Sequence, residues 1–415
     1  MLSTNNRKPC MNTLSWPEIN QPLSQLAQRI RHVSAESVTL LDAAGRVLAE
    51  DLVADRDSPA ADVSAMDGFA LRIAQLSTTG SLRIAGQSVP GSQPPQPQPG
   101  AVMQVFTGAI VPSSFDLVVR REDTIEEQGS IQLLDAAKNA MPGDHIRRQG
   151  ENLRQGKQVI RQGTMVTAPS IAAAANFGTS NLHVARRIRV SILTTGDELY
   201  PVEAAVSPWQ LRDSNGPTLH ALFNQHRFLD VNLPLRVSDD PPSIRRSLMK
   251  SLENSDAVFL TGGVSMGDFD FVPDAVRQCG GEIVFHKLPI RPGKPILGAI
   301  GPEGQLVIGL PGNSVSASVC ALRFGLPCLA KMAGVNEIYP PSMIMLTNSD
   351  AMTSPLHWFR LVVIVAPGVA ELVASHGSGD LVSLAKSRGF VHLPPGVGSD
   401  GRWPFWSWTE LTTLI

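Results

Sequence analysis

The chain has 415 residues, a length that predicts about two to four domains. Its 35 lysine and arginine residues nearly balance its 37 aspartate and glutamate residues, and a formal net charge of −2 without a basic tract excludes a dedicated nucleic-acid-binding protein. Although 43% of the residues are hydrophobic, the longest apolar runs are core-sized, so we expect no membrane span.

The first part of the chain predicts a helical and extended scaffold. Apolar residues at helical spacing predict a helix over residues 22–31, and residues 40–52 predict a second helix that leads into an extended arm. An Ala-rich helix over residues 170–177 then ends at Gly178. Because a segment of different character separates these helices, we expect a discontinuous scaffold domain formed by residues 1–58 and 145–185.

The separating segment predicts a β-rich insertion domain over residues 59–144. Its short alternating runs are divided by Gly/Pro clusters, of which residues 90–100 form the densest. Strands are predicted at residues 82–84, 102–106, 117–119 and 131–133. The segments on either side of the insertion, residues 64–70 and 143–152, should therefore lie near each other.

Strands and helices alternate in the next part of the chain, which predicts a largely parallel, doubly wound α/β domain over residues 186–335. Its strands are predicted at residues 190–193, 231–237, 257–260, 283–285, 296–299 and 306–310. Its helices are predicted at residues 216–223, 242–252, 271–279 and 314–332.

The C-terminal part returns to short strands with Gly-rich turns, which predicts a small β-barrel or sandwich over residues 336–415. Its strands are predicted at residues 344–346, 359–365, 391–393 and 406–411. The fold class is therefore α/β plus β in a multidomain chain.

Three glycine-containing loops follow predicted strand ends of the α/β domain, at residues 193–198, 260–270 and 309–314. Ligands of open α/β sheets bind outside the carboxyl ends of the strands, and glycines let backbone N–H groups approach an anion. Each loop alone also fits an ordinary tight turn. Together they favour a phosphate, or a pterin-type ring with a phosphate tail, and the lack of a Walker A or full GxGxxG sequence disfavours P-loop and nicotinamide sites.

Carboxylates gather on the same predicted rim. Glu198 and Asp270 follow strand ends, and Asp239 and Asp240 follow a neighbouring strand. Carboxylates beside a phosphate favour Mg²⁺, which prefers one or two carboxylates plus phosphate oxygens. The alternative is that these residues are helix N-caps.

Residues 286–295 form the densest cationic loop of the α/β domain. Its prolines would hold Lys287, Arg291 and Lys294 in a stiff, extended segment suited to an oxyanion. A solvated surface loop is the alternative.

The cysteines and the N-terminus bear on the cellular compartment. Four cysteines without CxxC spacing indicate neither a zinc site nor a disulfide framework, and the polar N-terminal segment lacks the apolar stretch of a signal peptide. We expect a soluble cytoplasmic protein with buried or idle thiols at Cys10, Cys279, Cys320 and Cys328.

Nine motifs occur together in a characteristic order, among them Ser-Ala-Met-Asp-Gly-Phe-Ala at residues 64–70 and Arg-Pro-Gly-Lys-Pro at residues 291–295. The others lie at residues 107–109, 146–151, 195–199, 213–215, 261–267, 310–313 and 377–380. In order and approximate spacing, the chain resembles the molybdopterin molybdenumtransferase family, which includes bacterial MoeA and the C-terminal domain of gephyrin. The resemblance extends from about residue 20 to the end of the chain.

The resemblance implies an enzyme of molybdenum cofactor biosynthesis. Such enzymes take adenylylated molybdopterin and molybdate, cleave the adenylate, insert the metal at the dithiolene and release AMP. It also implies an elongated four-domain homodimer with its active site between subunits, Mg²⁺ as cofactor, and a molybdopterin adenylyltransferase as a candidate partner.

The resemblance also implies two sets of site residues. The catalytic set is Asp67, Thr107, Arg147, Glu198, Asp239, Asp270, Lys287 and Lys294, in which Glu198 and Asp270 would hold Mg²⁺ and the nucleotide phosphates. The substrate-binding set is Asp213, Asn215, Gly262, Gly263, Ser265, Gly267, Arg291, Pro311, Gly312, Asn313 and Ser378. The four cations of these sets would attract molybdate or the pterin phosphate.

Two positions depart from the family pattern. Asn152 stands where the family commonly has Asp after Gly-Glu, and Ser314 stands where a second Pro usually follows Pro-Gly-Asn. The first change removes a negatively charged acceptor, and the second loosens the start of a helix. The other key carboxylates and cations are present, which favours retained activity.

Two other functions stay open at the level of sequence. A binding module with the same fold would act as a scaffold, for which Glu198, Asp270 and Lys294 would be unneeded. A molybdopterin adenylyltransferase would resemble residues 186–335, but the β insertion and the C-terminal barrel disfavour it. An assay of ATP consumption distinguishes the adenylyltransferase from the molybdenumtransferase.

Overall fold

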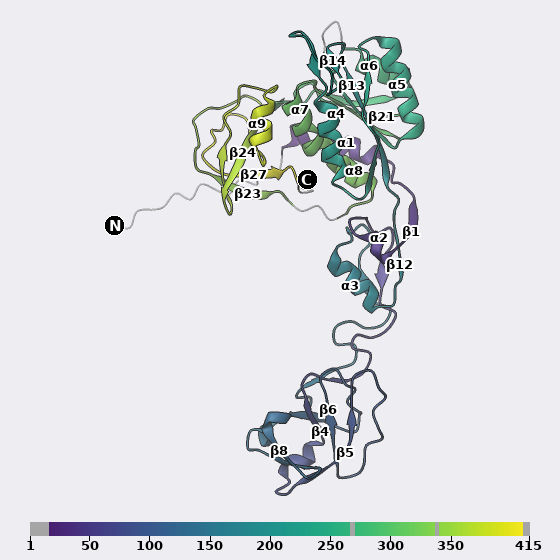
Figure 1. The fold of residues 1–415 in the computed structure, drawn as a ribbon, viewed down its shortest axis with the longest axis vertical. Coiled ribbons are helices and arrows are strands. Elements are labelled where there is room, and N and C mark those ends of the chain that lie inside the picture. Colours follow the sequence, from purple (N-terminus) through teal and green to yellow (C-terminus); the bar gives the residue numbers. More distant parts are fainter. Residues whose placement is uncertain (1–15, 266–269, 337–339, 410–415) are drawn as a thin grey trace, which may run out of the picture. The chain divides into compact units, whose positions relative to one another are not determined.

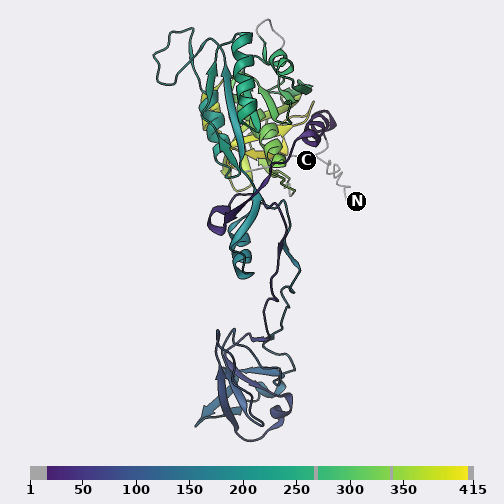
Figure 2. The ribbon, with the colours of Figure 1, turned by 90° about the vertical axis from the view of Figure 1, so that its right-hand side faces the viewer.

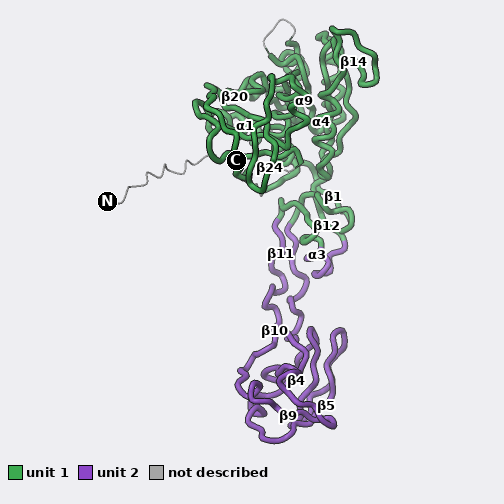
Figure 3. Tube along the Cα trace, turned by 60° about the vertical axis from the view of Figure 1, so that its left-hand side comes forward, with its two compact units in different colours: residues 1–50, 162–171, 181–415 green, residues 51–161, 172–180 purple. Residues whose placement is uncertain are grey.

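The computed structural model describes residues 16–265, 270–336 and 340–409. The chain divides into two compact units, shown in different colours in Figure 3. Unit 1 comprises the described parts of residues 1–50, 162–171 and 181–415, and unit 2 comprises residues 51–161 and 172–180. The division into four domains stays a prediction.

Unit 2 is built on a six-stranded sheet with the order β7-β4-β6-β5-β9-β8. Four of its strands lie where the alternating runs predict them, and β4 and β8 are additional. β4 is buried on both faces and β8 is largely exposed, so neither shows a clear alternation of polar and apolar residues. The strands are β4 (Gly68–Leu71), β5 (Leu82–Ser88), β6 (Val102–Val105), β7 (Leu117–Arg120), β8 (Thr124–Glu127) and β9 (Ser130–Leu133).

Short strand pairs, turns and a helix lie within the insertion and on either side of it. β3 (Val63–Ser64) pairs with β10 (Ile146–Arg147), and β2 (Leu52–Val53) pairs with β11 (Gln158–Ile160). The first pair confirms that the segments flanking the insertion lie side by side. Short 3₁₀ turns lie at Ile73–Ser77, Arg121–Asp123 and Ala137–Asn139, and the predicted Ala-rich helix is α3 (Ala168–Asn176).

The N-terminal part of unit 1 is less helical than expected. α1 (Pro17–Arg29) begins earlier than predicted, with Pro17 at its first position. The predicted helix over residues 40–52 is wrong beyond the single turn α2 (Leu40–Ala43). Gly45 adopts a positive φ of 74°, and Val47 and Leu48 then form β-bridges with Met165 and Val184. The preceding strand β1 (Ala35–Thr39) pairs with β12 (Asn181–Ala185).

The α/β part of unit 1 has a seven-stranded sheet with helices on both faces (Figure 1 and Figure 2). α1, α4, α7 and α8 contribute to the core on one face, and α5 and α6 contribute to the core on the other. These helices are α4 (Asn215–Asn224), α5 (Pro241–Asn254), α6 (Val272–Gln278), α7 (Ser314–Cys320) and α8 (Leu326–Met332).

The sheet has the order β16-β13-β18-β22-β21-β19, and β17 also pairs with β13. The pairs that join β13 to β16, β17 and β18, and β18 to β22, are parallel. β21 is antiparallel to both of its neighbours, β22 and β19. The strands are β13 (Ile188–Thr195), β16 (Leu229–Val231), β17 (Leu235–Val237), β18 (Ala257–Thr261), β19 (Glu282–His286), β21 (Leu297–Ile300) and β22 (Leu306–Leu310). A separate short pair joins β14 (Leu199–Tyr200) to β15 (Leu211–Arg212).

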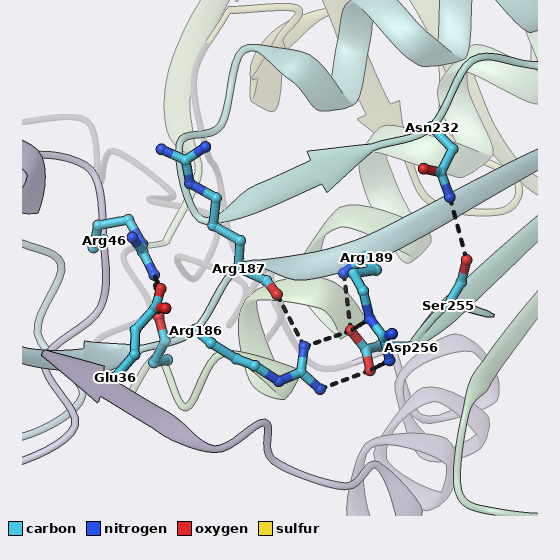
Figure 4. Close-up of polar contacts among 9 residues, drawn as sticks. Glu36, Arg46, Arg186, Arg187, Arg189, Asn232, Ser255 and Asp256 are labelled. Atoms are coloured by element: carbon cyan, nitrogen blue, oxygen red, sulfur yellow. Dashed lines mark hydrogen bonds and ion pairs between the residues drawn. The ribbon is translucent and has the colours of Figure 1, made fainter. Parts of the chain in front are cut away.

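The predicted strand over residues 231–237 is wrong, because the structure divides it into β16 and β17. Pro234 lacks a backbone N–H, and it lies between the two strands. Asn232 turns its side chain toward Ser255, to whose hydroxyl oxygen its Nδ2 donates at 3.4 Å (Figure 4).

A continuous helical segment runs from Ser314 to Met332, as predicted, and by length and composition alone it would be able to span a membrane. Nearly all of this helical segment is buried inside the structure. A π-helical segment, Ala321–Gly325, joins α7 to α8 within it. Burial in the core accounts for the apolar composition of this helix.

The C-terminal part of unit 1 is a closed barrel of five strands. The sheet order is β20-β24-β25-β23-β27-β26, and a further pairing of β24 with β26 closes the ring. The predicted combination of an α/β domain with a C-terminal β-barrel is therefore confirmed. The elements are β20 (Ile290–Arg291), β23 (Ser342–Leu346), β24 (His357–Ala366), β25 (Val369–Leu372), α9 (Leu381–Lys386), β26 (Gly389–Leu393) and β27 (Gly401–Ser407).

The predicted last strand at residues 406–411 lies too far along the chain. β27 ends at Ser407, and residues 410 and 411 lie outside the described residues. The earlier residues Trp403 and Trp406 are buried within the barrel region, which the alternation at the end of the chain did not reveal.

Asp256 joins the beginnings of two central strands. Its carboxylate accepts hydrogen bonds from Arg186 at 2.7 and 2.8 Å and from the backbone N–H of Arg189 at 2.9 Å (Figure 4). Hydrogen bonds from both arginines outweigh burial and hold the pKa of Asp256 well below its usual range. The carboxylate is therefore ionised at neutral pH and ties β13 to β18.

We expect Asp256→Asn to lower the free energy of unfolding by about 2 kcal/mol at pH 7, because it leaves two guanidinium groups without their carboxylate. Because the pKa is depressed in the folded state, this contribution is present above pH 4 and is lost as the pH falls further. Urea unfolding at pH 7 and pH 3 measures both effects. Asp230→Asn, on the exposed face of β16, is the control. Equal stability of the two variants at pH 7 would contradict this assignment.

Candidate functional site

A hollow of about 470 Å³ lies at the carboxyl ends of the central strands. Loops after β13, β18 and β22 supply Gly196, Gly262, Gly263 and Gly312 to its lining, as predicted for a shared rim. The loops approach one another closely. A Cβ on Gly262 would lie 2.6 Å from the backbone oxygen of Thr195, and Gly262 has a φ of 88°, so both space and conformation require glycine there.

Asp213 and Asn215 hold the neighbouring loops in place. The carboxylate of Asp213 accepts bonds from Thr194 Oγ1 at 2.8 Å and from the backbone N–H of Gly216 at 2.9 Å. Asn215 Nδ2 donates to the backbone oxygen of Gly312 at 2.6 Å. The other amide atom, Asn215 Oδ1, is buried without a hydrogen-bond partner within the described part of the chain. Asn215 lines the hollow, so its amide oxygen can accept a hydrogen bond from a ligand.

The predicted carboxylates meet in this hollow, which is lined by Glu198, Asp239 and Asp270. Asp240, and not Asp239, caps α5, because its carboxylate accepts from the backbone N–H of Ser243 at 2.9 Å. The N-cap alternative is therefore wrong for Asp239. For Asp270, the N-cap position of α6 is occupied by its neighbour Phe271.

The carboxyl group of Asp239 is partly buried among other negatively charged groups. Burial and then the negative charges of Asp197, Glu198, Asp270 and Asp240 raise the pKa of its carboxyl group. Its Oδ1 is buried and has no hydrogen-bond partner among the residues that the structure describes. An unpartnered, buried carboxylate oxygen beside other carboxylates fits a hard divalent cation.

The carboxylates do not form a complete metal site by themselves. No group of three or more His, Cys, Asp or Glu side chains that could hold a metal ion is found among the described residues. Mg²⁺ commonly takes one or two protein carboxylates and completes its shell with phosphate oxygens and water. Glu198, Asp239 and Asp270 are thus suited to an ion that arrives with a phosphate-bearing substrate.

A second hollow, of about 1060 Å³, adjoins the first and shares Pro295, Pro311 and Asn313 with it. It lies between the 291–295 loop and the C-terminal barrel, and Arg291 and Lys294 line it. The Lys294 side chain is exposed and forms no ion pair with any described residue. The second hollow therefore offers an uncompensated positive charge.

The 291–295 loop is fixed against the core helix. A Cβ on Gly293 would lie 2.3 Å from Cys320 Sγ, and Gly293 has a φ of 108°. Ser378, from the C-terminal barrel region, accepts a hydrogen bond from Asn313 Nδ2 at 3.0 Å and lines the same hollow. The α/β loops and the barrel thus form one continuous surface around the second hollow.

The sequence patterns do not point to several residues that line this hollow, among them Asp350, Trp358 and Arg360. The guanidinium carbons of Arg291 and Arg360 lie 4.8 and 4.5 Å from the Trp358 ring centroid. Arg360 also forms a bidentate pair with Asp350, at 2.7 and 2.8 Å. Strand alternation places Trp358 and Arg360 on the face of β24 that also carries Val362, where Trp358 packs against the edge of the barrel core, but only the structure shows that this face borders the hollow.

The other predicted site residues of unit 1 do not all line one of the two hollows. Ser265, Pro311 and Gly312 line the first hollow. Lys287 lines neither hollow, and its predicted role stays a prediction. Gly267 lies outside the described residues.

Asp67, Thr107 and Arg147 lie in unit 2. The backbone N–H and the hydroxyl of Thr107 donate to Asp67 Oδ1 at 2.7 and 2.8 Å, and these bonds lower the pKa of Asp67. Arg147 pairs with Glu151 at 2.6 Å and donates to Asn152 Oδ1 at 2.7 Å. Asn152 therefore keeps an acceptor oxygen beside Arg147, although it lacks the charge of the usual aspartate.

The second departure from the family pattern, Ser314, is also accommodated. Its hydroxyl lies 3.0 Å from the hydroxyl oxygen of Ser214, and its residue begins α7. This contact joins the loop before α4 to the loop before α7 on the rim of the first hollow.

Comparison with protein families gives two matches. Residues 18–178 match a model described as the MoeA N-terminal region (domain I and II). Residues 191–331 match a model described as a probable molybdopterin binding domain. The second match contains the strand ends and loops of the first hollow.

Similar proteins span nearly the whole chain. A molybdopterin molybdenumtransferase from Synechococcus elongatus is 36% identical over 375 residues, which cover 88% of this chain and 91% of that protein. One from Haemophilus influenzae is 33% identical, with 92% and 95% covered. A crystal structure of the molybdopterin biosynthesis moeA protein from Pyrococcus horikoshii has 25% identity and a TM-score of 0.78, with 93% and 98% covered.

Proposed function

The chain belongs to the molybdopterin molybdenumtransferase family, a family of enzymes of molybdenum cofactor biosynthesis, and from this premise we propose that it inserts molybdate into adenylylated molybdopterin and releases AMP. The observation that carries the proposal is the pair of adjoining hollows. One is lined by glycine loops and carboxylates. The other is lined by three cations, of which only Arg360 has a carboxylate partner among the described residues. This division suits a phosphate-bearing substrate beside an oxyanion.

The first hollow would take the phosphate-bearing substrate. Its glycine loops bring backbone N–H groups toward a phosphate, and the unpartnered Asn215 Oδ1 would accept from an N–H of the pterin or the base. Glu198, Asp270 and Asp239 would hold Mg²⁺ there. When bound, the ion supplies Lewis-acid polarisation of the phosphoanhydride.

The second hollow would take molybdate. Two anions must approach each other in this reaction, and positive charge reduces their mutual repulsion. Lys294, Arg291 and Arg360 supply that charge, and the Ser378 hydroxyl offers a hydrogen bond from the barrel side. We infer that these residues act electrostatically and by orientation, with little general-base catalysis.

The proposal extends to assembly and compartment, for which the family resemblance is the support. The enzyme would act in the cytoplasm as a homodimer, and the partner subunit's Asp67 and Thr107 would complete the cleft. Arg147 would attract molybdate or the pterin phosphate. A molybdopterin adenylyltransferase would supply the adenylylated substrate.

The test is AMP release from adenylylated molybdopterin in the presence of Mg²⁺, with and without molybdate, together with activation of an apo-molybdoenzyme. We expect AMP release that depends on molybdate and is accompanied by activation. Such a result would also show that Asn152 is tolerated. Tight substrate binding without turnover would contradict the proposal and favour a binding module, and consumption of ATP would favour an adenylyltransferase.

A further inference from the structure

A buried chain of hydrogen bonds lies behind the second hollow, in which no residue has a role in the proposed reaction. His357, the first residue of β24, and His392, on β26, are both fully buried. His357 Nδ1 lies 2.9 Å from His392 Nε2. The other ring nitrogen, His357 Nε2, lies 2.5 Å from a carboxylate oxygen of Glu18, in the first turn of α1.

The fourth member of this cluster is Arg323, in the π-helical segment of the core helix. Its guanidinium carbon lies 5.0 Å from the Trp406 ring centroid, and the side chain is fully buried. Burial lowers the pKa of Arg323 to about 10, so the group is charged at neutral pH. Burial, and the positive charge of Arg323, lower the pKa of both histidines, although Glu18 opposes this for His357.

Two neutral imidazoles between these charges have a single consistent arrangement of protons. The Glu18 carboxylate only accepts, so His357 Nε2 donates to it. His357 Nδ1 must then accept from His392 Nε2, which leaves His392 Nδ1 as a bare acceptor. Within the described part of the chain, His392 Nδ1 is indeed buried and unpartnered, as are Nε and Nη1 of Arg323. The chain of bonds therefore runs in one direction, from His392 to α1.

His357 also lies where β20, which carries Arg291, pairs with β24, which carries Arg360. Its backbone N–H donates to the oxygen of Pro289 at 2.9 Å. In the parallel pair of β20 and β24, His357 lies opposite Ile290, and Trp358 lies opposite Arg291. Because side chains alternate along a strand, His357 points into the protein while Trp358 and Arg360 face the hollow.

We propose that His357, held by Glu18 and His392, is a positioning residue for the second hollow: it fixes the junction of β20 and β24 so that Arg291 and Arg360 both lie against Trp358. α1, which is far from the hollow in sequence, thereby sets the spacing of its two guanidinium groups. The identity of the bound anion rests on the proposed function, whereas the arrangement of the arginines does not.

The first test is molybdate binding to the full chain by calorimetry, combined with the KM for molybdate and kcat of AMP release. We expect His357→Leu to weaken binding and to raise KM on the order of tenfold, with kcat changed less, because displaced arginines mainly affect capture of the anion. His226→Leu is the matched control, a half-buried histidine beside Phe228 after α4. Unchanged molybdate affinity in a folded His357→Leu variant would overturn the proposal.

Glu18 provides a second pair of variants, since its side chain is half exposed and its replacement should not prevent folding. Glu18→Gln keeps an oxygen that accepts from His357 Nε2, so we expect near-wild-type affinity. Glu18→Leu removes the acceptor, so we expect the weakened affinity of His357→Leu. Equal loss in both Glu18 variants would show that charge rather than the hydrogen bond matters, which would contradict the positioning role.

A crystal structure of His357→Leu separates this proposal from the proposed function. We expect at least one of Arg291 and Arg360 to leave Trp358, beyond the roughly 6 Å at which a guanidinium interacts with an aromatic face. Both arginines remaining at their wild-type distances would overturn the positioning role, whatever anion binds. Failure of the wild-type protein to bind molybdate would instead overturn the proposed function, and the structural comparison would still decide the positioning role.

Discussion

Replacement of Lys294 by alanine is expected to slow AMP release about 10²–10³-fold, the largest effect of any single substitution considered for this protein. The Lys294 side chain lines the second hollow and has no ion-pair partner among the described residues, so its full charge is available to the substrate anions. Removal of this charge leaves the repulsion between molybdate and the pterin phosphate less compensated. Rapid-quench measurement of AMP formation under saturating substrate gives the rate directly.

The folded state should not change in this variant, because the Lys294 side chain is exposed and the bond from Leu288 N–H goes to its backbone oxygen. A melting temperature equal to that of the wild type is therefore part of the expected result. Lys250→Ala, an exposed lysine on α5, is the matched control. Turnover at the wild-type rate in the Lys294→Ala variant would show that Lys294 has no role in the mechanism.

Glu198→Gln is expected to slow AMP release on the order of 10²-fold and to raise the Mg²⁺ concentration required for half-maximal activity. The variant loses one of the carboxylates that line the first hollow, and with it part of the attraction for a divalent ion. A Mg²⁺ titration of AMP release measures both quantities. Glu203→Gln, at an exposed residue between β14 and β15, is the control.

The same variant should be more stable than the wild type when metal is removed by EDTA. The charge of Glu198 contributes to the raised pKa of Asp239, and a carboxyl group whose pKa is raised in the folded state destabilises that state at neutral pH, where it is ionised. Loss of one neighbouring charge relieves this repulsion. A melting temperature in EDTA below that of the wild type would show that the carboxylates do not repel one another as the structure indicates.

The parts of the fold that depend on local patterns were predictable from sequence. The strands β13, β18 and β22 are short apolar runs followed by glycine loops, and the loops meet because parallel strands share one carboxyl edge. The segment after Ala43 was not predictable, because its apolar residues pair with Met165 and Val184. Contacts that are distant in sequence override the helical spacing there.

The residues of the candidate site were likewise predictable from sequence only where local patterns decide their position. Asp239 and Asp240 are adjacent, and the sequence could not decide which of them caps α5; the Ser243 N–H selects Asp240 and leaves Asp239 for the hollow. Trp358 and Arg360 carried no sequence signal for the site, because their position depends on how β24 pairs with β20. Pairing of strands from different parts of the chain creates the second hollow, and a local pattern does not contain that information.

The central claim is that the oxyanion binds in the second hollow, beside the carboxylate-lined first one. The most direct test is anomalous scattering at the molybdenum edge from crystals of the protein soaked with molybdate. We predict a molybdenum peak within the second hollow, close to Lys294, Arg291 and Arg360. A molybdenum peak among Glu198, Asp239 and Asp270, or molybdate-dependent AMP release with no molybdenum in the second hollow, would contradict the account.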